Sequence, residues 1–173
     1  PATSWVIADS FGGTGVSEQI VVYNPKSDNV SAAVSVVLND VPAEAQPEPF
    51  VLDIGPRNYE VVNIDTEARV PPGTLRWIRI DGLNGEKVVA RQAVRISATG
   101  GDGSAATRPQ VALGFASTPG ASAGATKWLV SSVDPGTQGQ SAVVIANPSA
   151  DVISVASVRS IREGKVVDEA KNL

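Results

Sequence analysis

The chain has 173 residues, 42% of them hydrophobic, and its 14 Lys and Arg against 18 Asp and Glu give a formal net charge of −4. This composition supports the packed core of one large or two small domains. The acidic balance argues against nucleic acid, which needs clustered cations. The absence of Cys and His excludes disulfides, thiolate chemistry and imidazole-based catalytic or metal sites.

No part of the sequence has the run of about 18 apolar residues that a membrane-spanning helix needs, so we predict no membrane span in this fragment. The first residue is Pro1 and no signal segment follows it. We therefore expect a mature or trimmed chain from which any targeting segment has been removed.

Seven short strands are predicted in the first hundred residues, separated by turns rich in Gly, Pro, Asn and Asp. Their ranges are 4–8, 18–23, 30–38, 50–54, 59–64, 74–80 and 87–96. Short strands at this spacing predict an all-β fold, an immunoglobulin-like antiparallel β-sandwich. We assign this first sandwich to residues 1–97.

The last two of these strands are predicted to form a hairpin, because 81–85 reads Asp-Gly-Leu-Asn-Gly. In a hairpin, strand alternation places Trp77 on the core face with Val88. The opposite face then carries Arg76, Arg91 and Arg95 as an outward cationic stripe. This stripe is a candidate ligand surface, able to bind an acidic polymer, although a solvated face paired with acidic residues is the commoner interpretation of such a pattern.

Residues 98–126 are rich in Gly, Ala, Ser and Thr, which is typical of a connector. A short strand is possible within it at 111–116. Residues 127–173 then repeat part of the first unit.

The repeat is visible as two ungapped matching stretches, each with a Trp, a Gly-Thr pair, an apolar run and an Asn-Pro pair. The corresponding positions are Trp5 and Trp128, Gly13-Thr14 and Gly136-Thr137, Asn24-Pro25 and Asn147-Pro148, and Asp28 and Asp151. A repeat of this size indicates tandem structural units. The second unit has counterparts of the first three strands only, at 128–133, 142–146 and 152–161, followed by a turn into Val166-Val167. We therefore expect it to pack on the first unit or to be completed by further chain or a partner.

Several other patterns could carry chemistry. The carboxylate pairs Asp53/Glu60 and Asp65/Glu67 could in principle serve hydrolysis, and the loop 81–86 could offer oxygen ligands to Ca²⁺. Solvated charges and ordinary turn chemistry are the favoured interpretations of both. The Gly-rich segments 12–15 and 100–103 lack the context of a phosphate-binding loop and are interpreted as turns. We predict no catalytic residue, metal site or cofactor.

The three Trp residues could stack on a sugar or a Pro-rich peptide, but Trp5 and Trp128 occupy matching repeat positions beside apolar residues, where a core role is favoured. Trp77 is expected in the core for the same reason, since it lies on the apolar face of the predicted hairpin.

The order of motifs along the chain resembles that of secreted or surface-anchored actinobacterial proteins of unknown function built from tandem β-sandwich repeats. The motifs are Trp5, Gly13-Thr14 and Asn24-Pro25, followed by Pro56-Arg57 and Trp77-Ile78-Arg79. The resemblance covers residues 5–97 and part of 127–161, and it carries no catalytic signature. It implies an extracellular or cell-surface location.

Together, these features predict a non-enzymatic extracellular structural or interaction module, whose partners are other repeats or neighbouring subunits. A carbohydrate- or cell-wall-binding module is the alternative, with cell-wall glycan as the partner. A carboxylate-dependent hydrolase is a third and weaker possibility.

Overall fold

A computed structural model of the chain describes residues 1–10, 15–39, 41–96, 114–125, 127, 144–149, 156–162 and 165–171. Ten strands lie in these ranges, and the helical segments among them are three short 3₁₀ turns. The strands are β1 (Ser4–Ser10), β2 (Val16–Tyr23), β3 (Val30–Leu38), β4 (Phe50–Ile54), β5 (Tyr59–Asn63), β6 (Arg76–Gly82), β7 (Val89–Ile96), β8 (Gly114–Pro119), β9 (Ser157–Arg162) and β10 (Lys165–Lys171). The 3₁₀ turns span Ala43–Ala45, Ile64–Thr66 and Leu83–Gly85.

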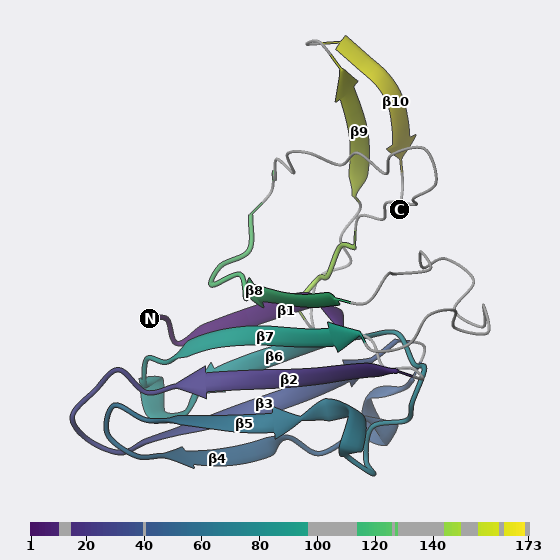
Figure 1. The fold of residues 1–173 in the computed structure, drawn as a ribbon. Coiled ribbons are helices and arrows are strands. Elements are labelled where there is room, and N and C mark those ends of the chain that lie inside the picture. The colour runs from purple at the N-terminus through teal and green to yellow at the C-terminus, as the bar shows by residue number, and fades with distance from the viewer. Residues whose placement is uncertain are drawn as a thin grey trace.

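Eight of these strands form two four-stranded sheets, in the orders β1-β6-β3-β4 and β5-β2-β7-β8. Every pairing within the sheets is antiparallel. The sheets stack face to face (Figure 1). The prediction of an all-β antiparallel sandwich is therefore confirmed, and all seven strands predicted in the first hundred residues are present.

The central pairs of the sandwich match those of an immunoglobulin domain, whereas the partners at the edges are exchanged. The pairs β2–β5 and β3–β6 correspond to strands B–E and C–F. In the immunoglobulin order the first strand lies beside B and the last beside F. Here the first strand, β1, lies beside β6, and β7 lies beside β2.

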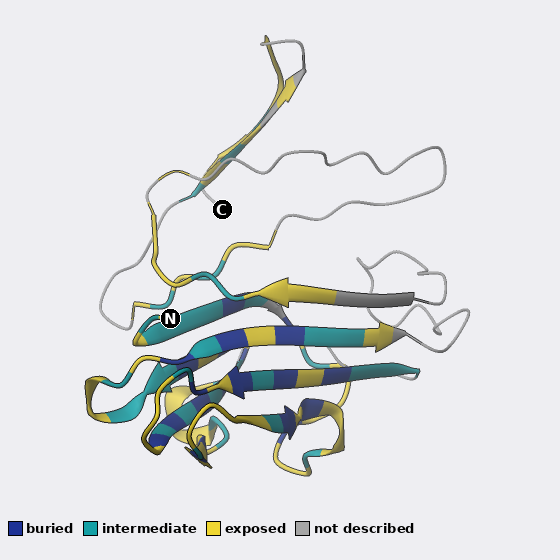
Figure 2. Cartoon of the chain, turned by 60° about the vertical axis from the view of Figure 1, so that its left-hand side comes forward, coloured by how far each residue is buried: buried dark blue, intermediate teal, exposed yellow. Residues whose placement is uncertain are grey.

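The core lies between the sheets and is built by alternation along each strand. In β3, the residues at every second position from Val30 to Leu38 are buried and those between them are partly exposed. Five isoleucines are fully buried, and burying each stabilises the fold by about 1.5–3 kcal/mol. These are Ile20, Ile54, Ile64, Ile78 and Ile80. Figure 2 shows the same alternation as bands of colour along the sheet strands.

The predicted hairpin between the sixth and seventh strands is wrong, because β6 and β7 belong to opposite sheets. The segment between them crosses from one sheet to the other through the turn Leu83–Gly85, in which Asn84 and Gly85 have φ of 54° and 75°. The alternation in β6 is consequently inverted: Ile78 and Ile80 point into the core, and Trp77 is only partly buried.

Trp5 packs against the core as predicted for that residue, and its indole Nε1 donates a hydrogen bond to the carbonyl of Val88 at 2.9 Å. The indole therefore links β1, in one sheet, to the residue that precedes β7 in the other. Trp128 lies outside the described residues.

One side of the sandwich is closed by backbone hydrogen bonds that join the two sheets. Ala2 and Val88 exchange a pair of bonds of 3.0 Å, and Val6 and Ala121 exchange a pair of 2.8 Å. We call these two pairs the closed seam. Gly120 makes the second pair possible, because a Cβ there would lie 3.3 Å from both the Trp5 Cβ and the Val6 oxygen.

The Asn-Pro turn of the first repeat is held by a fully buried side chain, that of Asn24. Its Nδ2 donates to the carbonyls of Asp28 (2.7 Å), Ile54 (3.1 Å) and Gly55 (2.9 Å), and its Oδ1 accepts from the amide of Lys26 (2.9 Å). One amide group thus fixes the loop after β2 to the turn after β4.

The connector also contributes to the sandwich. The strand β8 pairs with β7 and lies beyond residue 97, the boundary predicted for the first unit. It covers 114–119 where 111–116 was expected, and residues 111–113 lie outside the described part.

In the second repeat, the described strands are β9 and β10, which pair with each other and with no other strand that the structure describes (Figure 1). Most of the predicted strands at 128–133 and 142–146 lie outside the described residues. Asn147 repeats one contact of Asn24, since its Oδ1 accepts from the amide of Ser149 at 3.1 Å. Burial differs between the repeats: Val22 is fully buried, whereas its counterpart Ile145 is 53% exposed. At this position the second repeat is therefore not covered as the first is.

Gly120→Val should destabilise the closed seam, because the added side chain meets Trp5 and Val6 at sub-contact distances. We expect a loss of about 1–3 kcal/mol of unfolding free energy and faster hydrogen exchange at the amides of Val6 and Ala121. Gly124→Val is the matched control, as a Cβ there meets nothing within 4 Å. Equal melting temperatures for the two variants would contradict the assignment.

Asn24→Asp should be strongly destabilising, because a carboxylate oxygen would face three carbonyl oxygens in a buried site. We expect a loss of about 3 kcal/mol or more in urea unfolding. Asn147→Asp keeps the accepting oxygen at an exposed position and should change stability by less than about 0.5 kcal/mol. Similar effects at the two positions would show that the repeats use this residue in the same way.

Candidate interaction surface

The predicted cationic stripe does not exist as such, because the structure separates Arg76 from Arg91 and Arg95. Arg76 is 3% exposed and lies between the sheets, since β6 is not the hairpin partner of β7. Arg91 and Arg95 lie exposed on β7, as predicted. The prediction that Arg76 forms part of an outward surface is therefore wrong.

Arg76 instead belongs to a buried network of four side chains, one from each of β1, β2, β6 and β7. Its Nη2 pairs with Glu18 Oε2 at 2.8 Å, and its Nε donates to Ser10 Oγ at 2.9 Å. Ser10 Oγ donates to the same Glu18 oxygen at 2.8 Å, and Gln92 Nε2 donates to Glu18 Oε1 at 2.7 Å. We call this set, Ser10, Glu18, Arg76 and Gln92, the buried network.

The buried network is a structural element and leaves no reactive group available. Both oxygens of Glu18 are occupied, and its backbone amide donates to Asp65 Oδ1 at 2.7 Å. Within the described part of the chain, no buried side-chain nitrogen or oxygen lacks a hydrogen-bond partner. A buried pair satisfied in this way fixes geometry more than it adds net stability.

Arg91 and Arg95, the other two arginines of the predicted stripe, lie on the outer face of the sheet β5-β2-β7-β8. Directly opposite residues of antiparallel strands share a face, and the register places Tyr59, Tyr23 and Val89 in one row across the sheet. The next row holds Val61, Val21, Arg91 and Pro119. A third holds Asn63, Gln19, Ala93 and Ser117, and a fourth holds Ser17 and Arg95. We call the outward side chains of these four rows the tyrosine–arginine face.

Two exposed tyrosines mark one end of this face. Tyr23 is 37% exposed and Tyr59 is 57% exposed, and they stand directly opposite each other on β2 and β5. Neither residue was singled out in the sequence. The signal was present, because Tyr23 alternates with the buried Ile20 and Val22 and so has to point outward.

Arg91 and Arg95 are the only charged side chains among the outward positions of the described residues of this face. Neither has an ion pair within the described ranges. Every other described outward position is apolar, hydroxylic or an amide, and the amides of Gln19 and Asn63 are joined by a 2.8 Å hydrogen bond. The face therefore carries positive charge on a chain whose net charge is −4.

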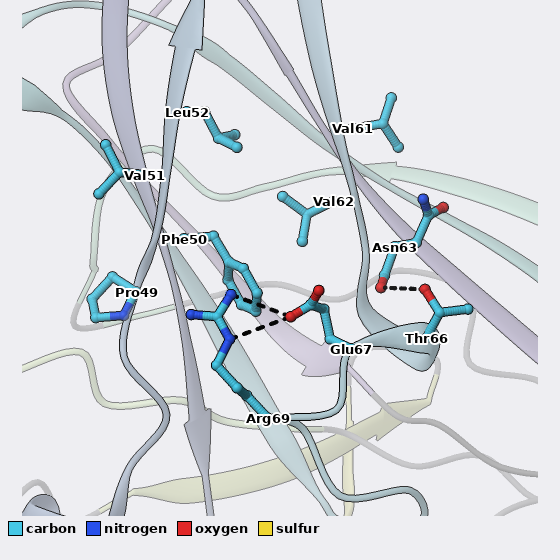
Figure 3. Close-up of a pocket in the computed structure, with 10 residues that line it drawn as sticks. All are labelled: Pro49, Phe50, Val51, Leu52, Val61, Val62, Asn63, Thr66, Glu67 and Arg69. Carbon is cyan, nitrogen blue, oxygen red and sulfur yellow. Dashed lines mark hydrogen bonds and ion pairs between the residues drawn. The ribbon is translucent and has the colours of Figure 1, made fainter.

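A groove of about 360 Å³ lies along one edge of the sandwich, between the edge strands β4 and β5 of the two sheets. Figure 3 shows Arg69 extending over the ring of Phe50, with the guanidinium carbon 3.9 Å from the ring centre. The same guanidinium contacts Glu67 Oε2 at 3.2 Å and donates to the carbonyl of Glu48 at 3.3 Å. Because these contacts occupy the guanidinium of Arg69, we interpret Arg69 as a structural residue that covers Phe50 at the edge of the core.

The carboxylates considered for hydrolysis mostly have structural partners. Asp53 accepts from Ser31 Oγ at 2.7 Å, Asp65 accepts the amide of Glu18, and Glu67 pairs with Arg69. Glu60 is exposed on β5. The two predicted pairs thus supply no pair of free carboxylates held face to face.

The loop 81–86 likewise uses its carboxylates in ion pairs, Asp81 with Arg79 at 2.7 Å and Glu86 with Lys26. No group of three or more Asp or Glu able to hold a metal ion occurs in the part of the chain that the structure describes. Of the Gly-rich segments, 12–14 and 100–103 lie outside that part.

The described residues include no helix long and apolar enough to cross a membrane.

Comparison with known proteins defines the fold and nothing further. No protein-family model matches the chain, and no curated protein matches it. Among solved structures, Thermotoga maritima 1070 is similar at 14% identity and a TM-score of 0.52, over 69% of this chain and 93% of that one. The Anabaena sensory rhodopsin transducer shows 16% identity and a TM-score of 0.44, over 53% and 86% of the two chains. The first likeness is one of fold, in agreement with the β-sandwich.

Arg76→Met should destabilise the protein by about 3–5 kcal/mol, because it leaves the Glu18 carboxylate buried without its cation. Chemical unfolding measures the loss. Glu18→Met combined with Arg76→Met should recover part of it, since no unpaired charge remains. The control is Arg79→Met, whose ion pair with Asp81 is partly exposed and should cost less than about 1 kcal/mol. Equal losses for Arg76→Met and Arg79→Met would refute the role of the buried network.

Proposed function

We propose that this chain is a non-enzymatic extracellular structural or interaction module of a repeat-containing bacterial surface or secreted protein. The observation that carries the proposal is the tyrosine–arginine face: two exposed tyrosines, and two arginines that have no ion pair among the described residues, on the outer surface of one sheet. Aromatic residues and Arg are the residue types enriched at contact surfaces and at their energetic centres. The sequence repeat and the resemblance to tandem surface proteins support the extracellular setting.

Other repeats of the same protein, or neighbouring subunits, are the first candidate partners. The exposed apolar residues of the second repeat favour such contacts. They are Val144, Ile145, Ile161, Val166 and Val167, which are between 45% and 61% exposed. Among the described residues β9 and β10 have no further strand beside them. A two-stranded ribbon on its own is at best marginally stable in water, so contact with a partner would stabilise it.

Binding of carbohydrate or cell wall is the second candidate function, favoured by the tyrosine pair. The rings of Tyr23 and Tyr59 lie opposite each other on adjacent strands and are accessible to a sugar. A carboxylate-dependent hydrolase gains no support, because Asp53, Asp65 and Glu67 are engaged in structural contacts.

The interaction role is tested by substituting both tyrosines of the face, Tyr23→Ser with Tyr59→Ser. Self-association of the full chain by sedimentation equilibrium and co-sedimentation with insoluble peptidoglycan are measured in parallel. We expect at least one of the two to be saturable in the natural chain and to weaken at least about tenfold in the double variant.

The control replaces Val51, which is 65% exposed on β4 of the opposite sheet, by Ser. A chain that stays monomeric at all concentrations and does not sediment with peptidoglycan would refute the proposed function. If association occurs and only Val51→Ser weakens it, the opposite sheet is the contact surface.

A further inference from the structure

The charge of the tyrosine–arginine face limits the kind of ligand that it can bind. Its charged outward side chains within the described residues are Arg91 and Arg95, and no Asp or Glu shares the face with them. Acidic residues outnumber basic ones in the chain as a whole. Segregating two cations on one surface of an acidic protein favours an anionic ligand there and disfavours a cationic one.

The order of rows across the sheet combines two kinds of contact. The row of Tyr59 and Tyr23 lies next to the row that contains Arg91, and successive outward residues of a strand are about 7 Å apart. Aromatic rings offer flat apolar contact, and the guanidinium offers a fixed fork of donors that matches the paired oxygens of a carboxylate or phosphate. A ring-containing anionic ligand can use both.

The third row adds neutral hydrogen-bonding groups between the two arginines. Gln19 Nε2 donates to Asn63 Oδ1, which leaves Gln19 Oε1 as an acceptor and Asn63 Nδ2 as a donor at exposed positions. Arg95 lies one row further, about 13 Å from Arg91 along β7. Arg91, the amides of Gln19 and Asn63, and Arg95 thus follow one another along the strand direction. A series of polar contacts along one line is what an extended polymer needs for binding.

We infer that the tyrosine–arginine face binds a linear anionic glycan, whose sugar rings contact Tyr23 and Tyr59 and whose acidic groups pair with Arg91 and Arg95. This inference rests on the proposed interaction function and names its ligand. Nucleic acid fits less well, because two cations on a chain of net charge −4 neutralise few phosphates. The acidic group of the glycan can be a carboxylate or a phosphodiester, which Arg recognises by the same chemistry.

Calorimetric titration of the full chain with three probes tests the inference: oligogalacturonate, phosphomannan, whose sugar rings are linked through phosphodiesters, and neutral xylo-oligosaccharide. We expect saturable binding of at least one anionic probe, about tenfold or more tighter than that of the neutral probe. Binding should weaken as salt is raised, because the arginines are exposed. A preference for oligogalacturonate identifies a carboxylated glycan, and a preference for phosphomannan identifies a phosphodiester-linked glycan.

The variants assign the contacts to this face. Arg91→Ala should weaken anionic binding about tenfold, Arg91→Lys should weaken it less because the charge remains, and Tyr59→Ala should weaken it several-fold. Arg79→Ala, on the outer face of the other sheet, is the matched control and should leave affinity unchanged. Melting temperatures within a few degrees of the natural chain confirm that these outward variants are folded.

Three outcomes would overturn the inference. Equal affinity for neutral and anionic probes would refute the preference for an anionic ligand, although the face would still bind carbohydrate. Anionic binding that Arg91→Ala and Arg95→Ala do not change would place the site elsewhere. A chain that binds no glycan, yet self-associates through Tyr23 and Tyr59, would overturn the ligand assignment and retain the proposed interaction function.

Discussion

The contact on which the two sheets depend is the ion pair between Glu18 and Arg76. The two residues come from opposite sheets, and Ser10 and Gln92 complete the set from one further strand on each side. A sliding of either sheet by one residue would leave the carboxylate buried without its donors, at a cost of several kcal/mol. Apolar packing of Val and Ile tolerates such shifts more readily, so the network fixes the alignment of an otherwise aliphatic core.

The same alignment determines what the outer face presents. With Glu18, Ile20 and Val22 turned inward, β2 has to present Gln19, Val21 and Tyr23 outward. Gln92 similarly fixes β7, so that Arg91 points to the opposite side from the network. The surface that we propose for binding is therefore set by the polar contact in the interior, through nothing more than strand alternation.

Much of the fold could be predicted from the sequence, because local patterns determine strands. The strands β3 and β4 have the predicted bounds. As expected, β2 ends just before Asn24-Pro25 and β4 ends just before Gly55-Pro56. Sheet membership could not be predicted in this way. The segment Asp81–Gly85 has the composition of a hairpin turn, yet it crosses between sheets, and the same residues favour either course. Because of that single ambiguity, the prediction assigned the two faces of β6 the wrong way round and placed Arg76 on the surface, whereas the structure places it in the core. Tyr23 and Tyr59 could have been placed outward from alternation alone, but their alignment across two strands required the register.

The closed seam has a consequence for how such units would follow one another in a chain. Ala2 and Ala121 are both held beside β1, since Ala2 lies two residues before it and Ala121 pairs with Val6 within it. Four residues of extended strand separate the two attachment points, about 13 Å, so the closed seam holds Ala2 and Ala121 on the same side of the sandwich. Successive units joined at these two points would each be attached to the connecting chain by the same side of the sandwich. Tension between the two attachment points would act first on β1 and on the hydrogen bonds of the closed seam, before it reached the pairings deeper in the two sheets.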